Sequence, residues 1–140
     1  MAMRHAKLSQ TGCNMEFLNS GKVLPAGLPF SEAVRIGDLF YLSGQMGIVP
    51  GTTRLVPGGI REEARQTLMN MRITLEAHGL SLRHVAKCTI FLADISEWQA
   101  FNEVYKDFFQ APYPARSALG ANGLALGGRV EVECVAVFSP

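Results

Sequence analysis

An arginine and two glutamates carry the strongest chemical signal in this sequence. Arg116 follows a proline in the segment Pro114-Ala115-Arg116-Ser117, and Glu131 and Glu133 lie in the apolar stretch over residues 130–137. A guanidinium grips a carboxylate through two parallel hydrogen bonds, and a carboxylate buried among valines holds its proton to a higher pH. These residue types favour a site that binds a small acid and transfers a proton.

Composition limits the classes of protein that need to be considered. The 140 residues carry 13 basic and 12 acidic side chains, a net charge of +1, which disfavours a nucleic-acid or membrane surface. The three widely spaced residues Cys13, Cys88 and Cys134 indicate neither a disulfide framework nor a zinc cluster. We expect one cytoplasmic domain over residues 1–140, with an irregular or flexible N-terminal extension over 1–14 and no metal.

Two short apolar stretches predict a β-hairpin. Residues 33–36 and 39–43 flank Gly37-Asp38, a pair suited to a two-residue turn. Because strand side chains alternate between faces, Phe30 and Ser43 are expected on the same face at one end of this hairpin. A further strand is predicted near residues 15–18.

Two amphipathic helices are predicted in the middle of the chain. The first has apolar residues at helical spacing from Ile60 to Leu75 and ends at Gly79. The second is expected to begin at a capping box of Ser96 and Gln99. It carries one aromatic stripe, which we interpret as core and which consists of Trp98, Phe101, Tyr105 and Phe108.

The remaining apolar stretches predict three more strands. They cover residues 85–92, a segment starting near Arg116, and residues 130–138. Segregated strand pairs with two helices predict an α+β sandwich in which both helices cover one face of a sheet. The last strand is apolar on both faces, so we expect oligomerisation to bury the second face. Cys88 is predicted to be a core thiol.

Strand register decides whether Arg116 and Glu131 can share a ligand. A two-residue turn before the last strand would separate them by roughly 26 Å along the strands. A genuine loop over residues 121–128 would instead place Arg116 opposite Glu133 or Val135, on the same face as Glu131. A shared site therefore predicts the loop.

Three motifs occur in the order and spacing of a known protein family. They are Ser43-Gly44-Gln45 after a strand, Phe101-Asn102 with Tyr105 in the second helix, and Pro114-Ala115-Arg116-Ser117 followed by Val130-Glu131-Val132-Glu133. From about residue 27 to residue 137 the chain resembles the RidA/YjgF/UK114 family of reactive-intermediate deaminases, some of which are described as L-PSP-type endoribonucleases.

The resemblance implies a chorismate-mutase-like α+β fold and a homotrimer with active sites between subunits. It also implies hydrolysis of enamine or imine acids such as 2-aminoacrylate to a 2-keto acid and ammonia, without a cofactor. By position, Arg116 would clamp the substrate carboxylate, and Glu131 would position or deprotonate the attacking water. The substrate-binding residues that it implies are Phe30, Ser43, Gly44, Asn102 and Ala118.

Three positions depart from the common family pattern. Phe30 stands where many members have tyrosine, Ala118 where cysteine is frequent, and Gly120 where an acidic residue is frequent. The phenolic hydroxyl is therefore missing, while the backbone amide of Ala118 can still serve. Two alternatives stay open: a trimeric carboxylate-binding or regulatory protein without efficient turnover, and a ribonuclease or translation inhibitor, which the near-neutral charge disfavours.

Other polar residues receive structural interpretations. His78 is expected to interact with backbone carbonyls at a helix end, and the three histidines His5, His78 and His84 lack the spacing of metal ligands. Glu133 is expected to be structural, paired at a subunit interface.

Overall fold

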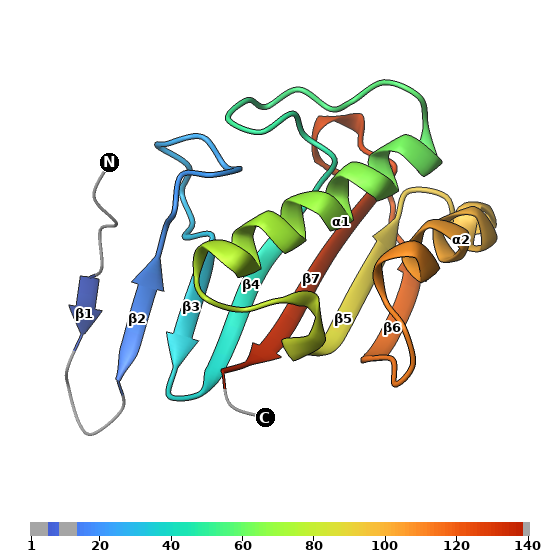
Figure 1. The fold of residues 1–140 in the computed structure, drawn as a ribbon. Coiled ribbons are helices and arrows are strands. Elements are labelled where there is room, and N and C mark those ends of the chain that lie inside the picture. Colours follow the sequence, from blue (N-terminus) through green and yellow to red (C-terminus); the bar gives the residue numbers. More distant parts are fainter. Residues whose placement is uncertain (1–5, 9–13, 139–140) are drawn as a thin grey trace.

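Seven strands form one mixed sheet in the computed structural model, which describes residues 6–8 and 14–138. The strand order is β1-β2-β3-β4-β7-β5-β6, and every neighbouring pair is antiparallel except β5 with β6. The strands are β1 (Ala6–Leu8), β2 (Met15–Leu18), β3 (Ala33–Ile36), β4 (Leu39–Gln45), β5 (Val85–Leu92), β6 (Ala115–Gly120) and β7 (Val130–Val137). Figure 1 shows α1 (Ile60–Ala77) and α2 (Trp98–Phe108) on one face of this sheet. The predicted α+β fold is confirmed.

The N-terminal strand lies inside the segment that was expected to be irregular. Ala6–Leu8 pair antiparallel with β2, so part of the predicted extension over residues 1–14 belongs to the sheet. Residues 1–5 and 9–13, including His5 and Cys13, lie outside the described part of the chain.

The β3–β4 hairpin and α1 follow the sequence pattern closely. Ile36 pairs with Leu39 across the predicted turn, where Gly37 adopts a φ of 58° that favours glycine. In α1 the predicted apolar positions from Ala64 to Leu75 are fully buried and Ile60 is partly buried, and acidic residues occupy the first turn, where the helix dipole favours them. A positive φ at Gly79 follows the end of the helix.

The start of α2 differs from the prediction. The side chain of Asp94 accepts a hydrogen bond from the backbone N–H of Ser96 at 2.9 Å, and a short 3₁₀ turn over Ile95–Glu97 precedes the helix. A carboxylate two residues upstream thus satisfies the N–H, and the expected Ser96–Gln99 capping box does not form. Tyr105 is buried as predicted, but Trp98, in the first turn, is 42% exposed.

The units β5, α2 and β6 form a β-α-β crossover, which gives β6 an unexpected neighbour. Cys88 on β5 pairs in parallel with Arg116 on one side and antiparallel with Cys134 of β7 on the other. A helical crossover returns the chain to the same end of the sheet and produces a parallel pair. The predicted pairing of Arg116 with Glu133 or Val135 is therefore wrong, although residues 121–128 do form a loop.

The core lies between the helices and the sheet, and no described helix or strand covers the opposite sheet face. Cys88 is fully buried in this core, as predicted, and burial raises the pKa of its thiol to about 11. On the other face Leu39, Tyr41 and Leu119 are exposed, because they alternate with inward residues of β4 and β6. We call this the outer face. Of the described helices, none has the length and apolarity to cross a bilayer.

Candidate functional site

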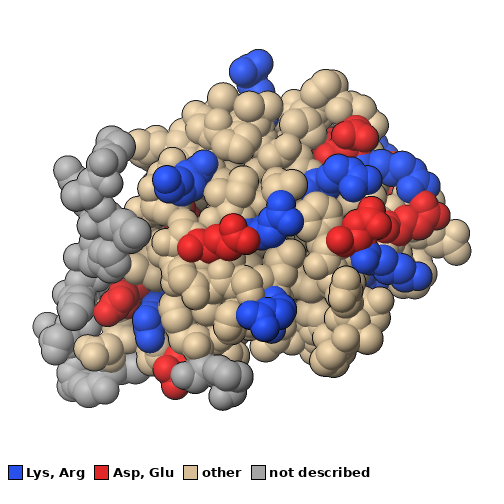
Figure 2. Space-filling view, in the orientation of Figure 1, with Lys and Arg blue, Asp and Glu red and all other residues tan. Residues whose placement is uncertain are grey.

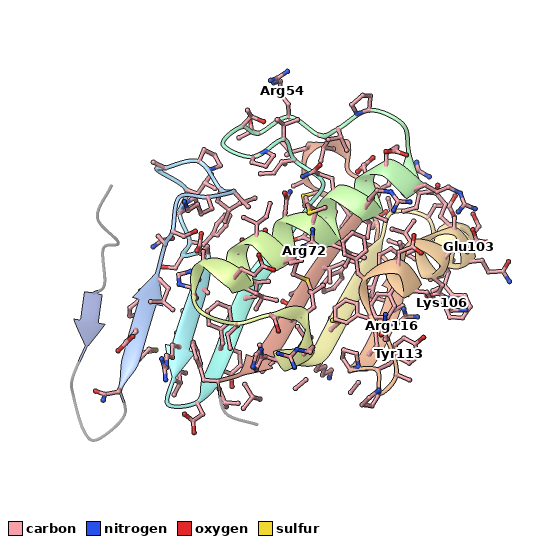
Figure 3. The ribbon with its side chains drawn as sticks, viewed as in Figure 1. Arg54, Arg72, Glu103, Lys106, Tyr113 and Arg116 are labelled. Carbon is pink, nitrogen blue, oxygen red and sulfur yellow. The ribbon has the colours of Figure 1, made fainter. Side chains whose placement is uncertain are left out.

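Arg116 lies on the helix side of the sheet, in contact with α2. Its Cζ is 4.7 Å from the centroid of the Tyr105 ring and 6.0 Å from that of Phe101. Figure 3 shows Arg116 beside Lys106 and Tyr113 at this end of the molecule. Stacking on an aromatic ring fixes the guanidinium plane and leaves its N–H edge available for a planar carboxylate.

A surface ion pair would be the simplest other role for this arginine. The contacts between basic and acidic side chains found among the described residues use the basic residues Arg61, Arg65, His78 and Arg129. Within that part of the chain, no carboxylate pairs with Arg116, which favours the ligand-binding interpretation.

A pocket of about 270 Å³ opens beside the guanidinium. Its walls come from α2 and from the segment leading into β6, and they consist of Trp98, Asn102, Tyr105, Lys106, Tyr113, Pro114 and Arg116. In the described structure, Asn102 Oδ1 is buried without a hydrogen-bond partner, whereas the Tyr105 hydroxyl lies against the Cys88 thiol. Buried polar atoms are normally paired, so the Asn102 oxygen is available to accept a hydrogen bond from a ligand.

Ala118 follows Arg116 by two residues and therefore shares its face of β6. Its side chain packs against the core, so only its backbone is left for a ligand. Because β6 is the edge strand of the sheet, alternate backbone N–H groups point away from β5. We refer to Arg116, Asn102, Ala118 and the pocket beside them as the arginine half-site.

Glu131 lies on the outer face, over the backbone of β4. Its carboxylate fills the space in which a Cβ on Gly44 would lie. The β4–β7 register shifts between Leu42 and Gln45, a local irregularity that brings Gly44 under the glutamate. Glycine at this position therefore makes room for the carboxylate.

The electrostatics of Glu131 suit a proton acceptor. Partial burial raises the pKa of its carboxyl above the ordinary value, and the neighbouring carboxylate of Glu133 raises it further. A carboxylate with a raised pKa takes up a proton more readily at neutral pH. The direction of this pKa shift agrees with the expectation that the glutamate keeps its proton to a higher pH.

Ser43 precedes Gly44 on β4, and Phe30 lies in the segment before β3. The Ser43 hydroxyl donates to the Ser31 carbonyl at 2.6 Å, which ties β4 to the residue after Phe30. Phe30 itself is 50% exposed. Ser43 also lines an outer-face hollow of about 450 Å³ together with Lys87, Thr89 and Glu133, among others. We refer to Phe30, Ser43, Gly44 and Glu131 as the glutamate half-site.

The two half-sites do not meet within one chain. Arg116 aligns with Cys88 of β5, whereas Glu131 aligns with Phe91, three residues farther along the same strand. Because this offset is an odd number of residues, the two side chains lie on opposite faces. The residues are two strands apart, so a strand spacing of about 4.8 Å and a rise of about 3.3 Å per residue place their Cα atoms about 14 Å apart. The expectation of one shared cleft is therefore wrong for a single chain.

The sequence also left some pocket residues unassigned. Trp98, Lys106 and Tyr113 line the arginine half-site, yet only Trp98 had received a role, and that role was in the core. The spacing of Trp98, Asn102 and Tyr105, four and three residues apart, places them on one helix face. With Asn102 in a site, this spacing already indicates that Trp98 faces the same site.

Known proteins share this architecture and much of the sequence. The family model described as Endoribonuclease L-PSP matches residues 21–138. A goat (Capra hircus) protein named 2-iminobutanoate/2-iminopropanoate deaminase is 46% identical over 117 residues, which cover 83% of this chain and 85% of that protein. The crystal structure of RidA from the Antarctic bacterium Psychrobacter is 37% identical, covers 84% of this chain and 94% of its own, and superposes with a TM-score of 0.79.

A third similar protein was crystallised with an amino acid. Escherichia coli TdcF with bound serine is 33% identical, covers 84% of this chain and 94% of its own, and has a TM-score of 0.77. The family match spans most of the chain, and the motifs around Ser43, Asn102, Arg116 and Glu131 lie within it. The chain therefore belongs to the Endoribonuclease L-PSP family, which is the RidA family that its sequence motifs resemble.

Proposed function

We propose that this protein is a hydrolytic deaminase that converts 2-imino acids, such as those formed from 2-aminoacrylate, to 2-keto acids and ammonia. The observation that carries the proposal is the Arg116 guanidinium over the Tyr105 ring, beside the Asn102 oxygen, with no described carboxylate paired with the arginine and no described donor to the oxygen, in a family whose goat relative is named an imine deaminase. The serine in TdcF supports a ligand with an amino-acid backbone, in which a carboxylate lies next to a nitrogen-bearing carbon.

The chemistry requires few groups. Arg116 binds the substrate carboxylate, and the enamine tautomerises to an imine whose carbon is already electrophilic. The imine nitrogen takes up a proton from solvent. Glu131 accepts a proton from water as the water oxygen attacks the imine carbon, and the C=N electron pair moves to nitrogen, which gives a carbinolamine. Glu131 then returns its proton to the nitrogen, and the hydroxyl gives its own proton to the freed carboxylate as the C–N bond breaks, which leaves the keto acid and ammonia.

The site forms between subunits of a homotrimer with a chorismate-mutase-like arrangement. The opposite-face placement of Arg116 and Glu131 supports this proposal, because a small acid cannot contact both within one chain. The exposed apolar side chains of Leu39, Tyr41 and Leu119 on the outer face support burial against another copy. In this arrangement the arginine half-site of one subunit meets the glutamate half-site of the next.

The activity is tested by generating 2-aminoacrylate with a dehydratase and following keto-acid release. Wild-type protein should accelerate release above the spontaneous rate, and Arg116→Ala should lose most of that acceleration. Equal rates with both proteins, at no more than the spontaneous rate, would contradict the proposed activity on this substrate. No metal or organic cofactor is expected to be needed.

Ribonuclease activity is the weaker interpretation, despite the name of the family model. The net charge is +1, and on the helix side of the molecule acidic and basic side chains alternate without a basic stripe (Figure 2). RNA cleavage that persists in Arg116→Ala would indicate a different site or a contaminant.

We also infer a cytoplasmic location. Because two relatives are named chloroplastic and mitochondrial, cell fractionation decides this point.

A further inference from the structure

A buried histidine and glutamate lie behind the glutamate half-site. His78, directly after α1, places its Nε2 2.5 Å from Oε2 of Glu32, the residue before β3, and their side chains are 4% and 2% exposed. The prediction that the His78 side chain serves carbonyls at the helix end is therefore wrong, although its backbone N–H does donate to the Leu75 carbonyl at 3.0 Å. Neither residue of the pair belongs to the two half-sites.

Glu32 is held from several directions. One carboxylate oxygen accepts from the Ser20 N–H at 2.9 Å, and the other accepts from the Ser20 hydroxyl at 3.0 Å. The Glu32 N–H donates to Asn19 Oδ1 at 3.0 Å. Together with His78, these contacts satisfy the buried carboxylate and fix the backbone at this residue.

The same residue is joined to the site through its backbone. The Glu32 carbonyl accepts from the Ser43 N–H at 2.9 Å, and the preceding carbonyl, of Ser31, accepts from the Ser43 hydroxyl. Phe30 is one residue farther upstream. Hydrogen bonds therefore connect His78 through Glu32 to Ser43, and the backbone of residues 30–32 continues the connection to Phe30.

Stability alone is a poor explanation for such a pair. A buried ion pair or polar pair replaced by apolar residues of similar size often leaves a protein equally stable or more so. What the apolar replacement removes is the defined position of the groups that the pair holds. Here those groups carry two of the residues of the glutamate half-site.

We propose that His78 and Glu32 are a positioning pair for the imine site. The pair fixes the backbone of residues 30–32 and, through it, the direction of the Ser43 hydroxyl and the place of the Phe30 ring. This inference rests on the proposed deaminase function, since Ser43 and Phe30 line the substrate cleft there. Neither His78 nor Glu32 touches the substrate.

Two variants separate positioning from a merely structural role. Glu32→Met/His78→Phe replaces the whole pair by apolar side chains and avoids leaving one buried partner unpaired. Glu32→Gln keeps one acceptor oxygen, which can serve the Ser20 N–H and the His78 ring, and its amide nitrogen can donate to the Ser20 hydroxyl oxygen. The double variant should fold and raise KM about fivefold to tenfold, the loss expected for one hydrogen bond, with kcat within about twofold. Glu32→Gln, in which His78 is unchanged, should keep KM within about twofold of the wild-type value.

An unchanged KM in the folded double variant would overturn the positioning role. A fall in kcat that merely matches the fraction of unfolded protein would overturn it too. A second readout does not depend on activity. Hydrogen exchange at the Ser43 amide should be at least about tenfold faster in the double variant, while the amides of Leu68 and Leu75 in α1 keep their rates. Equal acceleration at all three amides, or none at Ser43, would contradict the inference. If wild type fails to hydrolyse imines, the deaminase proposal fails while the exchange result still decides the role of the pair.

Discussion

The substitution Gly44→Ala tests whether the position of the Glu131 carboxylate matters for turnover. A Cβ at residue 44 would lie 2.9 Å from Glu131 Cδ and 3.1 Å from Cγ, and it would overlap Oε1. Carbon contacts are optimal at about 3.5–4.0 Å, so the carboxylate must move by roughly 1 Å. Because it is the end of a flexible side chain, we expect a stability loss near the lower limit for overpacking, about 1 kcal/mol.

The effect on catalysis should be much larger than the effect on stability. A misplacement of about 1 Å at a reacting group can lower a rate about 100-fold. We therefore expect kcat/KM of Gly44→Ala to fall about 100-fold in the keto-acid assay. The variant should still be folded, as shown by a cooperative unfolding transition in chemical denaturant.

Gly128→Ala is the matched control. There an added Cβ would overlap the Met46 methyl, also the end of a flexible side chain, and the backbone φ of −64° suits alanine. This control should show a similar small stability loss and nearly wild-type turnover. Full activity in folded Gly44→Ala would refute the assigned position of Glu131, and an equal loss of activity in the control would show that the effect is not local.

The other predictions concern Arg116, the titration of Glu131 and the buried thiols. Arg116→Ala should lower kcat/KM about 100-fold to 1,000-fold, because two charge-assisted hydrogen bonds are lost. Arg116→Lys should recover only part of this loss because lysine lacks the planar fork of arginine, and full recovery would contradict bidentate binding. The folded state raises the pKa of Glu131 and so binds its proton more tightly, which means that this residue's contribution to stability falls as pH rises from the ordinary carboxyl range through the raised pKa. Relative to wild type at equal protein concentration, Glu131→Gln should therefore gain denaturant resistance as pH rises above the ordinary carboxyl range, and a difference that does not change with pH would refute this titration. In a Cys13→Ser background at pH 8, Cys88 and Cys134 should react with a thiol reagent at least about 100-fold more slowly in native than in unfolded protein, because burial raises both thiol pKa values; equal rates would contradict their burial.

Local patterns in the sequence predicted most of the elements. The apolar spacing in α1 and the Gly37 turn are signals within a few residues, and the structure follows both. The strands β5 and β7 have nearly their predicted ends, because alternation and turn residues mark them. The chemistry of Arg116 and Glu131 could also be stated from residue type, although an arginine and a glutamate can equally form a surface ion pair.

Long-range pairing was the part that local patterns could not provide. Adjacent order along the chain favoured a β6–β7 pair, whereas the helix between β5 and β6 makes those strands parallel neighbours. The faces of Arg116 and Glu131 follow only from the registers of β5 with β6 and of β5 with β7 taken together. The His78–Glu32 contact joins residues 46 positions apart, and no short motif predicts it.

Subunit complementation tests the central claim, that Arg116 of one subunit and Glu131 of another form each site. Arg116→Ala and Glu131→Gln, each nearly inactive, should be dissociated, mixed in equal amounts and reassembled. In a randomly assembled closed ring, each interface takes its arginine from one subunit and its glutamate from the next. About one quarter of the interfaces then have both residues intact, so the mixture should recover about one quarter of wild-type activity. Recovery of no activity in properly reassembled mixed oligomers would contradict a site shared between subunits.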